Sequence, residues 1–245
     1  MKQIFAKPKK ASTVIILREC DSPECRFEVL MMKRHPGNSF VPGSYVFPGG
    51  GMDESDMEMR VHELCRGVDR DMAADIITDI DTPETALACW VTAIRETFEE
   101  SGILFACSGG DSLIALDPVD EKERFNRYRD MLNNKSISFI DIMQAENLML
   151  AAEKLHYYSH WITPFPSPIR YDTRFFIALA PENQEVCIDS RELVEYTWIT
   201  PEHALGKNRA GNFKMVYPTA VTLRSLASYT SVEQVLNHCC RVQAG

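Results

Sequence analysis

Hydrophobic and polar residues recur with two different periods along the chain, and these periods predict its elements. Residues 11–18 (ASTVIILR) and 27–34 (FEVLMMKR) are rich in apolar and β-branched residues, and a polar stretch with a proline separates them. This pattern predicts two strands joined by a loop at the start of the fold. Further strands are predicted at residues 157–163, 170–180, 185–188 and 195–199.

The helical period dominates much of the remaining chain. Residues 53–81 are acidic and locally helical, and Thr82, Pro83 and Glu84 then have the pattern of a helix start. Gly102 is expected to end this longer helix. Other helices are predicted at residues 121–132, 139–154 and 218–241. Because strands precede, interrupt and follow the helices, we expect a mixed α/β sandwich.

A turn-rich segment lies between the second strand and the acidic segment. In residues 39–53 (SFVPGSYVFPGGGMD), prolines and glycines interrupt short apolar pieces, so the backbone must turn repeatedly. A glycine-rich backbone also approaches ligands closely, because it carries no side chains. We therefore expect Gly49 and Gly50 to contribute to a binding site.

Composition and charge narrow the classes of function. The 245 residues are 45% hydrophobic and 25% charged, as in an ordinary globular protein, and the formal net charge is -9. No dense run of lysine and arginine is present, so no nucleic-acid partner is expected. The first ten residues are basic but lack the apolar segment of a signal peptide, and no stretch is apolar enough to cross a bilayer. We expect a cytoplasmic protein with no membrane partner.

Eight cysteines are scattered along the sequence without a C-x-x-C pair or a nearby pattern of histidine partners. This spacing does not favour a zinc site. In a chain without a secretory signal, we expect reduced thiols in the core or on the surface.

The helix that begins near Pro83 carries the candidate chemistry. Its apolar stripe is expected to be buried and consists of Leu87, Trp90, Val91, Ile94 and Phe98. Glu96, Glu99 and Glu100 lie at i, i+3 and i+4, so their carboxylates gather on another side of the same helix. Like charges at this spacing repel unless cations neutralise them, and clustered carboxylate oxygens suit Mg²⁺ or Mn²⁺. The alternative is a solvated helix face on which Arg95 and Glu99 form an ordinary ion pair.

Residues 95–103 (RETFEESGI) resemble the second half of the Nudix box, G-x5-E-x7-R-E-U-x-E-E-x-G-U, in which U is an apolar residue. Thr97 is the one mismatch, at the first apolar position. The first half of the box is altered: counting on from Gly50 places Asp56 at the acidic position, and a spacer far longer than seven residues follows. A long insertion within the box is similar to the branch of the superfamily that contains the peroxisomal acyl-coenzyme A diphosphatases.

Three other segments are similar to that branch. They are residues 31–50 (MMKRHPGNSFVPGSYVFPGG), 160–176 (HWITPFPSPIRYDTRFF) and 194–205 (VEYTWITPEHAL). The resemblance implies one Nudix domain over residues 1–245, an α/β/α sandwich with a mixed sheet. A helical insertion would occupy residues 53–81, within the box, and a second helical segment residues 118–154.

The resemblance also implies a mechanism. Glu96 and Glu100 would be the principal metal ligands, with Glu99 and the Gly50 carbonyl completing the shell and Arg95 orienting a neighbouring carboxylate. The cofactor would be Mg²⁺ or Mn²⁺, which neutralises a diphosphate and activates the attacking water. The substrate would be a small-molecule diphosphate, above all coenzyme A or an acyl-coenzyme A. The sequence leaves open whether the protein forms a homodimer.

Two sets of residues keep open roles. Glu96, Glu192 and Glu195 are the candidate general bases, and none is favoured. Four cations are candidates for binding the substrate's phosphates, although each is equally a candidate for a surface ion pair: Lys33, Arg34, Arg170 and Arg174. Asp172 is expected to order Arg170 or Arg174 on its strand.

Three other functions are compatible with the sequence. The first is a pyrophosphatase of the same fold that cleaves an ADP-sugar or a dinucleotide, such as ADP-ribose or NADH. The second is a non-catalytic nucleotide sensor of the same fold, although such sensors usually lack the glutamates that are intact here. The third is an interaction protein that uses the acidic segment 53–81 as a docking surface.

Overall fold

The computed structural model describes residues 7–20, 25–116 and 118–243. Most of the basic N-terminal segment, residues 1–6, lies outside the described residues. The strands are β1 (Lys9–Glu19), β2 (Phe27–Arg34), β3 (Tyr45–Val46), β4 (Gly49–Gly51), β5 (Cys65–Arg66), β6 (Ala106–Cys107), β7 (Met149–Ala151), β8 (His156–Ile162), β9 (Tyr171–Leu179) and β10 (Leu193–Ile199). The α-helices are α1 (Met59–His62), α2 (Arg70–Ile76), α3 (Pro83–Ser101), α4 (Val119–Asn133), α5 (Phe139–Ala145), α6 (Pro201–Arg209), α7 (Tyr217–Leu226) and α8 (Val232–Gln243). Two short 3-10 helices are η1 (Glu54–Met57) and η2 (Ala152–Lys154).

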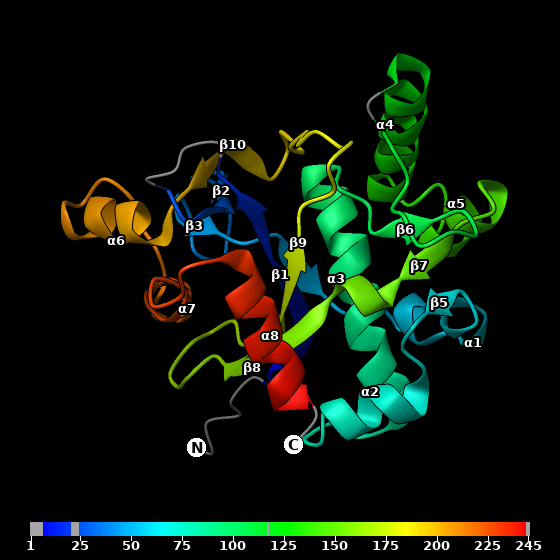
Figure 1. Cartoon of the computed structure of the whole chain (residues 1–245), viewed down its shortest axis with the longest axis horizontal. Coiled ribbons are helices and arrows are strands. Elements are labelled where there is room, and N and C mark those ends of the chain that lie inside the picture. Colours follow the sequence, from blue (N-terminus) through cyan, green and yellow to red (C-terminus); the bar gives the residue numbers. More distant parts are fainter. Residues whose placement is uncertain (1–6, 21–24, 117, 244–245) are drawn as a thin grey trace.

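The main sheet is mixed and has the strand order β10-β2-β1-β9-β8, with β3 added to β2 and β4 added to β1. Strand β1 pairs with β9 in parallel and with β2 and β4 in antiparallel fashion. Both faces of β1 are buried: Val14 and Ile16 face one core, and Ile15 and Leu17 face the other. Helix α3 covers one face and α6, α7 and α8 cover the other (Figure 1). The predicted α/β/α sandwich with a mixed sheet is confirmed.

Local sequence explains why α3 forms where it was predicted. Thr82 caps its start, since the Thr82 side chain accepts a hydrogen bond from the Thr85 N–H, and Pro83 occupies the first turn. Gly102 ends the helix in the left-handed conformation, at φ 77°. The buried Trp90 indole N–H donates to the Leu155 carbonyl at 3.0 Å, which fixes the helix against the later part of the chain.

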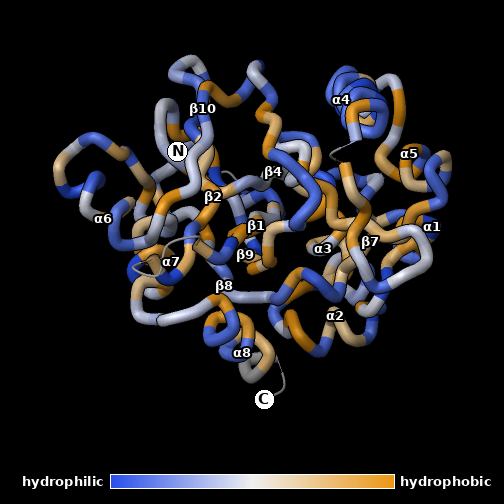
Figure 2. Tube along the Cα trace, turned by 45° about the horizontal axis from the view of Figure 1, so that its top comes forward, coloured by the Kyte–Doolittle hydropathy of each residue, from blue (hydrophilic) through white to orange (hydrophobic). Residues whose placement is uncertain are grey.

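The acidic segment 53–81 holds η1, α1, β5 and α2, so it is not wholly helical. Its strand β5 joins β7 and β6 in a separate three-stranded sheet. The second segment, 118–154, holds α4, α5, β7 and η2. Helix α4 is mostly hydrophilic, and only Phe125 and Arg129 of it are buried (Figure 2). No helix in the described part of the chain combines the length and the apolar character needed to cross a membrane.

Several expected elements differ from the structure. Residues 185–188 form no strand, because the Cys187 and Asp189 N–H groups donate to the Ser101 and Glu100 carbonyls at the end of α3. The helix expected at residues 139–154 stops at Ala145, because residues 149–151 pair with β5 and β6 instead. The expected C-terminal helix is two helices, α7 and α8.

The expectation that the cysteines are reduced is wrong for one pair. Cys20 and Cys25 form a disulfide, because the connection between β1 and β2 brings their Cα atoms within 5.7 Å. The other six cysteines are free, as expected.

Candidate active site

Two glutamates of α3 meet the glycine strand β4. The Gly49 N–H donates to Glu100 Oε2 at 2.9 Å. A Cβ added to Gly50 would lie 2.4 Å from Glu96 Oε2, which is shorter than any normal contact, so the Glu96 carboxylate occupies the space that a side chain would need. The absence of side chains in β4 therefore lets carboxylates from α3 touch its backbone.

Arg95 holds the carboxylates of this site together. Its guanidinium donates to both carboxylate oxygens of Asp56, at 2.8 Å each, and to the Gly51 carbonyl at 2.8 Å. It also bonds to Glu96 at 2.9 Å and to Glu99 at 2.8 Å. Arg95 and Glu99 do form the ion pair that a solvated helix face would have. However, this ion pair belongs to a network in which Arg95 is only 4% exposed. It does not belong to a fully solvated helix face.

Asp56 belongs to the site, although no role was assigned to it from the sequence. It is 2% exposed and bonds to Arg95 and, at 2.8 Å, to the Thr92 hydroxyl. Its place in the sequence could have indicated this role, because Asp56 lies six residues after Gly50, where the Nudix box has an acidic residue. The mismatched Thr97 is fully buried, so it fills an apolar position of the box with a small polar residue.

Burial dominates the electrostatics of the three glutamates. Burial raises the pKa of Glu96 to about 7, even though the nearby Arg95 lowers it. Burial, and then repulsion from Glu96, raise the pKa of Glu100 well above its usual range, and burial also raises the pKa of Glu99. Buried carboxylates with raised pKa values take up protons or cations readily.

This donor set fits a hard divalent cation, because it offers carboxylate oxygens in a shielded place beside the β4 backbone. Among the described residues, no group of three or more His, Cys, Asp or Glu side chains is already arranged around one point for a metal ion. Glu96 and Glu99 are turned toward Arg95, while Glu100 bonds to Gly49. The three-glutamate convergence expected from the sequence is therefore partial.

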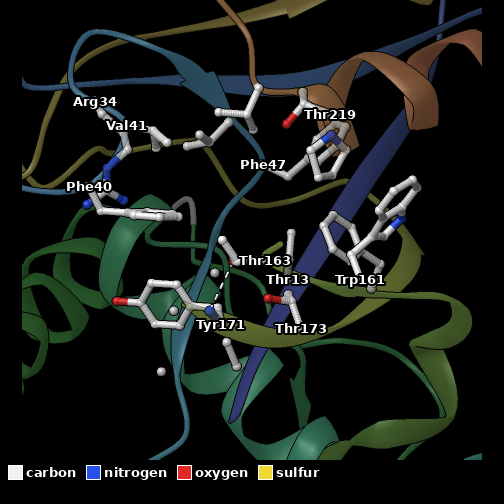
Figure 3. A pocket seen from close by; sticks show the side chains of 18 of the residues that line it. Thr13, Arg34, Phe40, Val41, Phe47, Trp161, Thr163, Tyr171, Thr173 and Thr219 are labelled. Carbon is white, nitrogen blue, oxygen red and sulfur yellow. Dashed lines mark hydrogen bonds between the residues drawn. The ribbon is translucent and has the colours of Figure 1, made fainter. Parts of the chain in front are cut away.

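A cavity of about 650 Å³ opens beside these carboxylates. Its floor consists of β1, β4, β8 and β9, and the start of α7 and the loop after β2 enclose it. Figure 3 shows Arg34 and Phe40 on one side of the cavity and Trp161 and Phe47 on the other. This volume lies within the range of ordinary small-molecule sites.

Six of the sequence-predicted residues line this cavity: Arg34, Gly49, Gly50, Glu96, Glu100 and Glu192. The Arg34 guanidinium lies 3.9 Å from Glu100 and 3.9 Å from Glu192, so it stands between two carboxylates. Candidate metal ligands, a candidate base and a candidate phosphate-binding cation are thus brought to one end of the cavity.

The remaining predicted residues do not line the cavity. Lys33 lies 3.6 Å from Glu195, which accepts a hydrogen bond from the Tyr45 hydroxyl. Arg170 donates to the Thr163 carbonyl at 2.9 Å, and its guanidinium lies over the Phe165 ring. Glu99 faces Arg95.

Arg174 belongs to a different network. It is 2% exposed and forms an ion pair with Asp79 at 3.0 Å. It also forms an ion pair with Asp172, which was expected to order Arg170 or Arg174. His160 also contacts both aspartates. Because side chains alternate along β9, Thr173 faces the cavity while Arg174 faces the other side of the sheet, where it anchors the segment before α3.

The aromatic wall of the cavity was not predicted from the sequence. Trp161 and Tyr217 pack edge to face with ring centroids 6.0 Å apart, and Phe47 and Phe175 do so at 6.5 Å. These residues come from four separate parts of the chain, so no local spacing relates them.

Comparison with known proteins decides the family. A sequence model described as the NUDT19 Nudix domain matches residues 8–226, which include every candidate residue discussed above. The chain belongs to this Nudix family. The earlier resemblance to the Nudix superfamily, and to the branch with the long insertion, is confirmed.

Similar proteins agree with this Nudix assignment. The chain is 26% identical to the acyl-coenzyme A diphosphatase NUDT19 of Xenopus laevis over 85% of its length, and 26% identical to that of Homo sapiens over 87%. The matches span 62% and 64% of those two proteins, which is less than two thirds of their length. A crystal structure of a NUDIX hydrolase from Alicyclobacillus acidocaldarius is 26% identical, with a TM-score of 0.70, and the match covers 95% of this chain and 96% of that one.

Proposed function

We propose that this protein hydrolyses the diphosphate linkage of coenzyme A or of an acyl-coenzyme A, with Mg²⁺ or Mn²⁺ as cofactor. One observation supports this most strongly. In a chain of the NUDT19 Nudix family, the partly buried carboxylate of Glu96 and the buried carboxylate of Glu100 border a substrate-sized cavity beside the glycine strand β4. The names of the relatives from Xenopus laevis and Homo sapiens point to the coenzyme A class of substrate.

Glu96 and Glu100 are the residues that would hold the metal, with Glu99 and the Gly50 carbonyl as further ligands. When bound, a divalent cation neutralises diphosphate oxygens and lowers the pKa of water. Arg95 positions Glu96 and Glu99 through its charge-assisted hydrogen bonds and is itself held by Asp56. Arg34, at the cavity wall, would bind a phosphate oxygen of the substrate.

Glu192 is the general base that we propose. Of the three candidates, Glu96 is committed to Arg95 and the metal position, and Glu195 is bonded to Tyr45 away from the cavity. Glu192 lines the cavity and is half-exposed, next to Arg34. A proton taken from the attacking water would pass to the Glu192 carboxylate and from there to solvent.

The test is a panel of diphosphates. Purified protein with Mg²⁺ or Mn²⁺ is expected to hydrolyse coenzyme A to a product that retains phosphopantetheine, and to do so faster than it hydrolyses ADP-ribose or NADH. The reverse preference would favour an ADP-sugar or dinucleotide pyrophosphatase. Nucleotide binding without turnover of any diphosphate tested, by the wild type and by Glu100→Gln alike, would favour a sensor.

We also propose that residues 1–245 form one Nudix domain interrupted by the segment 53–81. The protein would act on a small molecule in the cytoplasm, and a homodimer is compatible with this function.

A further inference from the structure

The end of the cavity away from the carboxylates has its own chemical character. Phe47, Phe175, Trp161 and Tyr217 supply aromatic surface there, and Val216 and Pro218 add aliphatic surface. Tyr217 is 71% exposed although its ring packs against Trp161, so the wall continues to the mouth of the cavity. We call this set of six residues the aromatic arm.

Charge is concentrated at the opposite end. The charged residues that line the cavity, within the described part of the chain, are Arg34, Glu96, Glu100 and Glu192. Arg34 is close to both Glu100 and Glu192, and Glu96 lies against Gly50, so all four surround the proposed reaction centre. The aromatic arm itself contains no lysine, arginine or histidine.

Hydroxyl groups accompany the aromatic arm. Thr163, Thr173 and Thr219 line the same part of the cavity, and Thr163 accepts a hydrogen bond from the Tyr171 N–H at 3.0 Å (Figure 3). Hydroxyls can both donate to and accept from an amide. A surface of aromatic rings with interspersed hydroxyls therefore suits an uncharged ligand that carries amides and apolar groups.

Resting on the proposed function, we infer that the aromatic arm binds the pantetheine and acyl end of the substrate and that the adenine nucleotide lies on the other side of the diphosphate. Pantetheine is uncharged and has two amides, and an acyl group adds apolar surface. The nucleotide of coenzyme A carries a 3′-phosphate, and burying that charge in an arm without a cation would be unfavourable. Trp161 and Tyr217 would then determine the preference for acyl chain length.

The competing placement puts the adenine ring on Trp161 by stacking, since adenine also favours aromatic surfaces. The two placements differ in which half of the substrate depends on Trp161. Binding of S-decanoyl-pantetheine and of 3′,5′-ADP, measured separately by calorimetry, distinguishes them without any turnover.

The variant to test is Trp161→Ala. We expect about 10-fold weaker binding of S-decanoyl-pantetheine and an unchanged affinity for 3′,5′-ADP. The ratio of kcat/KM for decanoyl-coenzyme A to that for ADP-ribose is expected to fall by about 10-fold. Trp161→Phe keeps an aromatic ring and is expected to retain most of the wild-type preference.

Trp198→Ala is the matched control, because Trp198 is also partly buried but lies on β10 outside the cavity. Thermal unfolding of each variant reports whether it is folded. The inference would be overturned if Trp161→Ala weakened the binding of both ligands equally, or weakened the binding of 3′,5′-ADP alone. If the wild type binds S-decanoyl-pantetheine through Trp161 but hydrolyses no coenzyme A species, the proposed function fails and the assignment of the arm stands.

Discussion

The Asp56 carboxylate and the Arg95 guanidinium are buried together, and every oxygen of Asp56 has a partner on Arg95. Removing the Asp56 charge weakens the charge-assisted hydrogen bonds that hold the Arg95 guanidinium. Asp56→Asn is expected to lower the free energy of unfolding by about 1.5–3 kcal/mol, because Glu96 and Glu99 still compensate the charge of Arg95. Asp53→Asn is the matched control, since the Asp53 side chain is 69% exposed and lies 3.9 Å from Arg95. Asp53→Asn should lower the free energy of unfolding by less than about 0.5 kcal/mol. Equal unfolding midpoints in urea for the two variants would contradict this account.

Gly50 and Gly51 are neighbours in β4 but differ in the space around them. A methyl group at Gly50 would meet the Glu96 carboxylate, whereas one at Gly51 would meet nothing within 4 Å. We expect Gly50→Ala to displace Glu96 and to reduce kcat by roughly 100-fold, as displacements of about 1 Å do. Gly51→Ala should keep activity within a few-fold of the wild type. Similar activities of the two variants would show that close contact with Glu96 does not matter.

Glu192 and Glu195 are three positions apart, yet only Glu192 lines the cavity. If Glu192 is the base, Glu192→Gln should reduce kcat by about 10²–10⁴-fold with a small effect on KM. Glu195→Gln keeps a hydrogen-bond acceptor for Tyr45 and should leave kcat nearly unchanged. Full activity of Glu192→Gln would move the role to Glu96 or to another group.

At the scale of elements, α3 shows what a single sequence predicts well. Thr82, Pro83 and Gly102 act on the backbone beside them, so the start and end of the helix are encoded locally. The strand at residues 149–151, which depends on distant partners, was not predicted. Residues 149–151 follow a helical pattern but form a strand, because β5 and β6 offer hydrogen bonds that the sequence around them does not reveal.

The segment before α3 contains a histidine whose titration should affect stability. His62, in α1, is 9% exposed, and burial, together with the charge of Arg70, lowers its pKa below 6.5. Between that lowered pKa and 6.5 the unfolded chain binds more protons than the folded one, so stability is lost as the pH falls through this range.

The test compares unfolding midpoints at pH 7 and pH 5. We expect His62→Gln to lose less stability than the wild type on acidification, because the buried group no longer takes up a proton. His203→Gln, at an exposed position of α6, is the control and should follow the wild type. An identical pH dependence in all three proteins would exclude His62 as the source.

At the scale of the whole molecule, the sequence could not predict the cavity. Glu96 and Glu100 share one helix, but Arg34 reaches the same space from β2, Trp161 from β8 and Glu192 from the loop before β10. Arg174 illustrates the converse, since its sequence neighbours Thr173 and Phe175 line the cavity while its own side chain faces the opposite layer. The pairing of β1 with β9 places Thr13, Thr173 and Phe175 on the cavity side of the sheet.

Cation binding should stabilise the whole fold. A ligand at 100 times its dissociation constant adds about 2.7 kcal/mol, which corresponds to a rise of roughly 5–10 °C in the unfolding midpoint of a protein of this size. We expect saturating Mn²⁺ or Mg²⁺ to produce such a rise, EDTA to reverse it and Glu100→Gln to reduce it strongly. An unchanged midpoint at millimolar concentrations of both cations would argue against the proposed site.

The glycine strand β4 separates two layers that supply different parts of the site. Glutamates from the α3 layer reach the cavity past its bare backbone, whereas Trp161, Phe175 and Tyr217 belong to the layer of α7 and α8. Under the proposed function, bond cleavage and the choice of substrate would depend on different layers of the fold. Grafting β8 and the start of α7 from another family member should transfer its substrate range while the machinery for hydrolysis is left untouched.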